Sequence, residues 1–335
     1  MGLFEKFSQA NRLIRIDTEL GNDTLLLTKV VGNEALSRPY QFTLTCLSQL
    51  SAIEPNKLMG KAIDFSFELN DGGERTFNGI VCEIRHRGKV SDTLYQYELK
   101  LVPQLWLLSQ RTNIRIYQHK TIPQIVEQLL AEHQVVFESK LTASYPVHEY
   151  CVQYQETDLD FVQRLLAEAG IFYYFKQQPN QHQLILLDDK NQYESEGSGL
   201  LNQSYGTLES EHFSEWQTSS QLLPIKYSSN SYDFKHPASS LRSENENSEN
   251  EALDANNMEV YRYPGDYQSK GDGQTEAAKR LEAIQKHQLE VYAESNIRDL
   301  KVGHVYSIAK HENINEIGNS YLVTELEYLP ATLCS

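Results

Sequence analysis

Apolar and polar residues alternate along much of the first hundred positions of this 335-residue chain. In residues 40–47, Phe42, Leu44 and Cys46 fall on one side and polar residues fall on the other. A period of two is typical of half-buried β-strands. Strands are therefore predicted at residues 11–17, 25–31, 40–47, 62–69, 75–85 and 95–102, with a hairpin turn at residues 70–73. Such a series of antiparallel strands is enough for a small barrel or sandwich.

Helical spacing replaces this alternation after residue 113. Thr121 and Gln124 form a capping-box sequence with an early proline, and apolar residues then recur every three or four positions. A second helix is predicted to begin after the N-cap Thr157 and to end at Gly170, where a left-handed C-terminal cap belongs. Short strands are predicted at residues 135–138, 171–175 and 184–187, with a loop over 177–183.

Strands resume in the last part of the chain. They are predicted at residues 208–218, 225–234, 302–309 and 320–329, with a helix at 274–288. Residues 243–257 are rich in Glu, Asn and Ser, which predicts a solvated acidic loop. The predicted fold class is mainly β with α+β insertions. Three domains are expected: a first β-barrel-like domain at 1–112, a small α+β domain at 113–196 and a second β-barrel-like domain at 197–335.

A short internal echo links the two ends of the chain. Gly60 precedes a predicted strand and lies 20 residues before Ile80, while Gly303 precedes another and lies 19 residues before Leu322. Patterns this short also arise by chance. A duplication of one β-domain and a coincidence therefore both remain open at this stage.

Composition excludes several classes of protein. A chain of this length suggests two or three domains. The formal net charge of −16 and the absence of a basic stripe argue against nucleic-acid binding and against anionic membrane surfaces. Tyrosine outnumbers phenylalanine, 20 to 12, which suits strands and surfaces where chains meet.

The N-terminus has no secretory h-region and no apolar run spans a membrane, so a cytoplasmic protein is expected. Cys46 and Cys82 are predicted to be buried thiols.

Motifs for catalysis or cofactor binding are missing from the sequence. It contains no nucleophile elbow, zinc-protease helix, Walker loop or dinucleotide fingerprint. The closest histidines in the sequence, His304 and His311, are seven residues apart, whereas zinc ligands usually cluster at shorter spacing with cysteine or carboxylate partners, so no metal site is predicted. No cofactor, no catalytic residue and no enzymatic activity are expected. A carboxylate pair for glycoside hydrolysis is the alternative, because such pairs come from distant sequence.

Two aspartate pairs suggest chemistry but have simpler explanations. Asp158 and Asp160 lie in the first turn of the second helix, where the helix dipole favours negative charge. Asp188 and Asp189 follow a hairpin, where a solvated turn is expected in place of an acid or a calcium ligand.

The segment at residues 151–175, CVQYQETDLDFVQRLLAEAGIFYYF, resembles the signature of VgrG, the valine–glycine repeat spike protein of type VI secretion. Further similar segments follow the order of that family, and together the resemblance spans about residues 12–330. They are RPYQF at 38–42, SYDFKHP at 231–237, EVYRYPG at 259–265, VG at 302–303 and YLVTE at 321–325.

The resemblance implies a phage-tail-hub fold with two barrel-like tube domains joined by a smaller α/β domain. Three chains would form a ring of six similar units, so that a threefold spike fits a sixfold tube. The implied partners are two further copies in a homotrimer, the hexameric inner tube protein, baseplate proteins, and effector or spike-tip proteins. The family's hub module has no catalytic residues. The implied location is the cytoplasm until assembly, followed by secretion through the type VI machine.

Members of the family continue into a further small β-domain and a β-helix needle, whereas this sequence ends at Ser335. The sequence is therefore expected to be either a piece of a longer protein or a truncated relative. Two other functions stay open. One is the tail hub of a contractile phage or bacteriocin particle, and the other, from a different class, is a cell-wall glycosidase.

Overall fold

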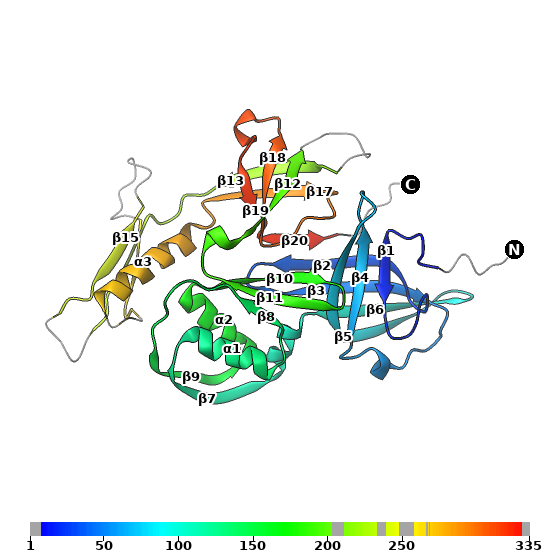
Figure 1. The fold of residues 1–335 in the computed structure, drawn as a ribbon, viewed down its shortest axis with the longest axis horizontal. Coiled ribbons are helices and arrows are strands. Elements are labelled where there is room, and N and C mark those ends of the chain that lie inside the picture. Colours follow the sequence, from blue (N-terminus) through cyan, green and yellow to red (C-terminus); the bar gives the residue numbers. More distant parts are fainter. Residues whose placement is uncertain are drawn as a thin grey trace. The chain divides into compact units, whose positions relative to one another are not determined.

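A computed structural model describes residues 8–202, 211–232, 239–247, 258–265, 267 and 269–329. The described chain is mainly β, as predicted, with three α-helices in these residues (Figure 1). It divides into two compact units, of which the first combines residues 1–202 with residues 297–335 and the second contains residues 203–296. No helix in the described part is long and apolar enough to cross a bilayer.

A seven-stranded antiparallel sheet is the largest sheet in the described part of the chain, and it confirms the strands predicted before residue 103. The strand order is β1-β4-β5-β6-β3-β2-β20. The bounds are β1 Ile14–Asp17, β2 Leu26–Ala35, β3 Arg38–Ser48, β4 Ala62–Glu68, β5 Glu74–Ser91, β6 Leu94–Val102 and β20 Glu325–Tyr328. Ile16 of β1 and Val30 of β2 belong to the same core, so the sheet curls around one apolar interior. Phe42, Phe65 and Phe77 lie at its centre with their rings in contact.

The α+β region packs two helices between two small sheets (Figure 1). Its elements are β7 Thr112–Lys120, α1 Ile122–Glu132, β8 Phe137–Ser139, β9 His148–Thr157, α2 Asp158–Ala169, β10 Phe172–Gln178 and β11 Gln181–Leu187. Both predicted N-caps are confirmed, because Thr121 and Thr157 accept hydrogen bonds from Gln124 N and Asp160 N. Gly170 ends α2 with φ of 70°. The predicted loop at 177–183 is too long, because β10 extends to Gln178 and β11 begins at Gln181.

His182 connects the α+β region to the large sheet. Its Nε2 accepts the backbone N–H of Gln104, so Nδ1 carries the proton and donates to Asn78 Oδ1 at 2.8 Å. Burial lowers the pKa of His182 to about 4, which keeps the ring neutral in this arrangement. The histidine therefore acts as a fixed structural connector near neutral pH.

The last part of the chain returns to the first unit. β12 Glu194–Asn202, β18 His304–Lys310 and β19 Ser320–Leu322 form a three-stranded sheet. The prediction of one continuous strand at 320–329 is wrong. The strand β19 ends at Leu322, and the following strand β20 pairs with β2 of the large sheet. The buried Arg75 holds this segment by two hydrogen bonds: it donates to Tyr328 Oη at 2.9 Å and to the carbonyl of Arg298 at 2.8 Å.

The second unit carries two small sheets and α3. The sheets comprise β13 Phe213–Ser220 with β17 Leu289–Ser295, and β14 Lys226–Ser229 with β15 Ser243–Glu246 and β16 Glu259–Arg262. The prediction of a loop from residue 243 is wrong for Ser243–Glu246, which pairs with β14; residues 248–257 lie outside the described part. α3 spans Lys270–Gln285 and begins earlier than predicted, because Ser269 caps the N–H of Asp272.

Four short 3-10 turns complete the described elements. They are η2 Pro55–Lys57, η3 Gln104–Gln110, η4 Lys190–Gln192 and η6 Ile314–Glu316. The predicted third domain, 197–335, is divided between the two units. The predicted boundaries of three domains, at 1–112, 113–196 and 197–335, stay a prediction.

Candidate functional site

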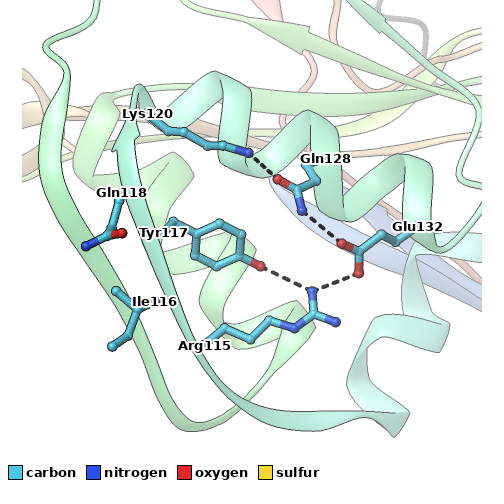
Figure 2. Close-up of a pocket in the computed structure, with 7 residues that line it drawn as sticks. All are labelled: Arg115, Ile116, Tyr117, Gln118, Lys120, Gln128 and Glu132. Atoms are coloured by element: carbon cyan, nitrogen blue, oxygen red, sulfur yellow. Dashed lines mark hydrogen bonds and ion pairs between the residues drawn. The ribbon is translucent and has the colours of Figure 1, made fainter.

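A surface hollow lies between β7 and the second half of α1, and it measures about 440 Å³. It is lined by residues 115–118 and Lys120 of β7 together with Gln128 and Glu132 of α1. Figure 2 shows Arg115, Tyr117 and Lys120 directed toward α1, while Ile116 and Gln118 point away from it. Four consecutive residues of one strand line the hollow, so it runs along the backbone edge of β7.

A chain of hydrogen bonds surrounds the Tyr117 ring in this hollow (Figure 2). Lys120 Nζ donates to Gln128 Oε1, and Gln128 Nε2 donates to Glu132 Oε1 at 3.1 Å. Arg115 Nη1 donates to Glu132 Oε2 at 2.8 Å and to Tyr117 Oη at 3.4 Å. Partial burial opposes ionisation of Glu132, but the hydrogen bonds from Arg115, Arg111 and Gln128 outweigh it and lower its pKa to about 2. Hydrogen bonds therefore hold the polar side chains that line the hollow in place.

Glu132 joins this chain of bonds to a buried carboxylate. Arg111 donates to Glu132 at 2.9 Å and also pairs with Asp158, whose side chain is fully buried. Gln153 Nε2 and His133 Nε2 lie 2.7 and 2.9 Å from the two oxygens of Asp158. Burial raises the pKa of Asp158, but these three partners together lower it below its ordinary value. Asp158 and Asp160 both lie in the first turn of α2, as predicted. Asp160 is exposed, whereas Asp158 is buried and joins the C-terminal ends of η3 and α1 to β9 and α2.

The hollow carries a small surplus of positive charge. Arg111 is matched by Asp158 and Arg115 by Glu132, whereas Lys120 is paired with the neutral amide of Gln128 and with no carboxylate in the described part of the chain. An amide oxygen satisfies one donor of the ammonium group but does not neutralise it. This local surplus contrasts with the net charge of −16 of the whole chain.

The other face of the β7–β9 ribbon is apolar and open. Ile114 pairs with Tyr154, Ile116 with Val152, and Gln118 with Tyr150 across the two strands. Side chains that alternate along each strand share one face, and Tyr117 on the opposite face is buried against the helices. Ile116 and Tyr154 are each 66% exposed. Contiguous apolar patches of this kind mark interaction sites.

The second aspartate pair is structural. The carboxylate of Asp188 accepts the backbone N–H groups of Thr142 and Ala143 and the hydroxyl of Tyr145, at 2.8–2.9 Å. Burial raises its pKa, but these bonds outweigh burial and lower it. Asp189 caps η4 by accepting the N–H of Asn191. Asp188 lies in a partly exposed bend, as predicted, and it also anchors the loop before β9.

The remaining candidates are dispersed. His304 is buried in β18 beside the Tyr174 ring, whereas His311 lies beyond the end of that strand. In the part of the chain that the structure describes, no group of His, Cys, Asp and Glu side chains is placed to hold a metal ion. Cys46 is buried as predicted, and burial raises the pKa of its thiol. Cys82 is only half-buried, so that part of the prediction is wrong.

Sequence reasoning missed β7 and therefore missed both the hollow and the apolar ribbon. The signal was present as an alternation of Ile114 and Ile116 with Arg115 and Tyr117. It was short, and its apolar residues are the exposed ones, so the usual assignment of apolar residues to the interior would have reversed the two faces.

Comparison with known proteins places most of the chain in one family. Residues 33–331 match the family model described as phage tail baseplate hub (GPD). The type VI secretion spike protein VgrG1c of Pseudomonas aeruginosa is 33% identical over 328 residues, which is 96% of this chain and 44% of that protein. VgrG1a of the same organism is 32% identical over 329 residues, 96% of this chain and 50% of that protein. The chain thus spans about half the length of the curated relatives it matches.

Solved structures with a similar fold include secretion and phage proteins. The E. coli c3393 protein, a type VI secretion component described as similar to the T4 tail proteins gp27 and gp5, has a TM-score of 0.70 at 23% identity and covers 93% of this chain and 71% of its own. The 43 kDa tail protein of prophage MuSo2 from Shewanella oneidensis has a TM-score of 0.64 at 12% identity, covering 93% and 92% of the two chains. The predicted phage-tail-hub fold and the resemblance to VgrG are confirmed.

Proposed function

Because this chain belongs to the phage tail baseplate hub family, we propose that it forms the hub of a type VI secretion spike. The observation that carries the proposal is the relation to P. aeruginosa VgrG spike proteins along 96% of the chain. The role is mechanical: the chain supports a spike and does not break bonds. Its polar clusters support this, since Asp158, Asp188 and Glu132 each fix neighbouring segments.

We propose further that three copies assemble into a ring that adapts a hexameric tube to a threefold spike. Two similar strand pairs in the first unit, one after Gly60 and one after Gly303, support this arrangement. Gly60 N–H donates to Val81 O and Val81 N–H to Lys61 O, at 2.8 and 3.0 Å. Gly303 N–H donates to Val323 O and Val323 N–H to His304 O, at 2.9 and 3.0 Å. Two equivalent strand pairs in each chain would give a trimer six similar elements.

The proposed partners are the tube protein on one side, baseplate proteins around the ring, and effector or spike-tip proteins beyond it. The proposed route starts in the cytoplasm, where the spike assembles, and ends with export through the type VI machine. The tail hub of a contractile phage is the second candidate, favoured by the fold match to the MuSo2 prophage protein.

Mass photometry of the purified chain over a range of concentrations, followed by pull-down with a hexameric tube protein, tests the assembly. A trimer that retains the tube protein supports the proposed hub. A chain that stays monomeric at all concentrations, also when extended by the segments that follow the hub in its relatives, contradicts it. Export of the full protein that requires an intact secretion sheath favours the secretion system over a phage particle.

A further inference from the structure

The free edge of β7 combines three features. In the described part of the chain, β7 pairs only with β9, so its other edge has no strand partner. An open hollow lies beside that edge, and an open apolar face continues from the same strand on the opposite side. Unpaired edges are templates for another strand, and folded proteins usually cover them.

An added strand would place its side chains alternately in the hollow and on the apolar face, because side chains of a strand alternate between two faces. On the hollow side it would meet Lys120, which has no described carboxylate partner, and Arg115, whose Glu132 partner is shared with Arg111. On the other side it would extend the row formed by Ile114, Ile116 and their partners in β9. The complementary sequence therefore alternates acidic and apolar residues.

We propose that the free edge of β7 is a docking site for an extended segment of a partner protein in which acidic residues alternate with apolar ones. Main-chain hydrogen bonds to β7 would provide register and part of the affinity, and the two sets of side-chain contacts would provide specificity. The charge complementarity is local, since a chain of net charge −16 repels acidic segments over most of its surface. The proposal concerns this surface alone and does not depend on the hub function.

The direct test uses a synthetic peptide about as long as β7 in which glutamate alternates with valine, and a matched peptide with lysine in place of glutamate. Binding to the whole chain is measured by fluorescence polarisation, and the site by hydrogen exchange. The glutamate peptide is expected to bind more tightly and to protect the amides of Thr112–Lys120. Overall electrostatics favour the lysine peptide, so equal or tighter binding of that peptide overturns the proposal, as does protection confined to other strands.

Variants separate the two sides of the site. Lys120→Gln removes the unmatched charge and is expected to weaken the glutamate peptide about tenfold, an effect that disappears at high salt. Ile116→Glu places a charge on the apolar face and is expected to abolish binding, whereas Ile314→Glu, at a residue 77% exposed in η6, leaves binding unchanged. All three sites are at least partly exposed, and circular dichroism checks that the variants fold.

Two further outcomes contradict the proposal. Lysine at a sheet edge also serves as a guard against unwanted pairing. If Lys120→Gln strengthens peptide binding or causes self-association, the residue is a guard and not a docking contact. If Ile116→Glu dissociates an oligomer of this chain and the glutamate peptide does not compete with that oligomer, a second copy occupies the edge and the partner segment is excluded.

Discussion

The Gly60 and Gly303 strand pairs use one backbone arrangement in two different surroundings. Both glycines have positive φ, 74° and 81°. Ala62 pairs with Ile80 after Gly60, and Val305 pairs with Leu322 after Gly303, so the registers are equivalent. The first pair lies within a seven-stranded sheet, while the second belongs to a three-stranded sheet with β12 in the described part of the chain. The sequence echo therefore corresponds to a real structural repeat of the turn, and the packing around it differs.

The two glycines differ in the space around them, and this difference gives the largest predicted effect. A Cβ at Gly303 would lie 2.6 Å from Tyr174 Cγ, whereas at Gly60 it would meet nothing within 4 Å. Gly303→Ala is expected to cost about 3–5 kcal/mol from left-handed strain plus overlap, and Gly60→Ala about 1–2 kcal/mol from strain alone. Urea unfolding of both variants measures the difference. Equal losses would show that the Tyr174 contact is relieved by movement.

Burial of the equivalent paired residues gives the next effect. Ile80 is buried, 6% exposed, while Leu322 is only half-buried. Ile80→Ala is therefore expected to cost about 2–4 kcal/mol and Leu322→Ala about 1 kcal/mol, because the cavity term is smaller at a partly open site. Thermal and urea melts of the two variants test this. A larger loss for Leu322→Ala would mean that the second pair is as deeply packed as the first.

Arg75 ties β20 and the segment near residue 298 to the large sheet, and its substitution is expected to have a local effect. Arg75 bonds Tyr328 and the Arg298 carbonyl and lies 4.6 Å from the centre of the Phe77 ring. Arg75→Met keeps most of the apolar contact but leaves Glu34 buried without its cation. Faster hydrogen exchange is expected in β20 and at residues near 298, with β3 and β6 unchanged as internal controls. Uniform acceleration would show that the anchor supports the whole sheet.

Glu34 of the large sheet and Glu194 of the three-stranded sheet are expected to make the free energy of unfolding depend on pH with opposite signs. This is the smallest of the predicted effects. Burial raises the pKa of Glu34 despite Arg75, so its contribution to stability falls as pH rises above the unfolded value of 4.5. Glu194 of β12 is partly buried, but Lys176, His304 and Lys140 outweigh this and lower its pKa. Its contribution is present above pH 4.5 and is lost as pH falls below that value.

Glutamine variants read out the two signs separately. Glu194→Gln is expected to flatten the loss of stability on acidification below about pH 4.5, whereas Glu34→Gln removes a loss on alkalinisation above it. Unfolding free energies from urea melts at several pH values are the measurement. Slopes of the same sign for both variants would contradict this account of the two carboxyl groups.

Features that depend on neighbours in sequence were determined by the sequence alone. The caps of α1 and α2 need only Thr121 with Gln124, Thr157 with Asp160, and a glycine at 170, since each contact spans a few residues. The alternation of β3, β4 and β6 likewise fixed which residues form the core of the large sheet. The similarity of several short segments to VgrG then indicated how these elements are connected.

Contacts between distant segments were decided only by the tertiary structure. Tyr328 meets Glu34 across 294 positions, and Asp158 is buried because Arg111, His133 and Gln153 arrive from three other elements. The open edge and reversed faces of β7 depend on which strands lie beside it. A local pattern specifies a strand and its two faces, but which face is buried and which edge is paired depend on the segments that pack there, and no short stretch of sequence contains that information.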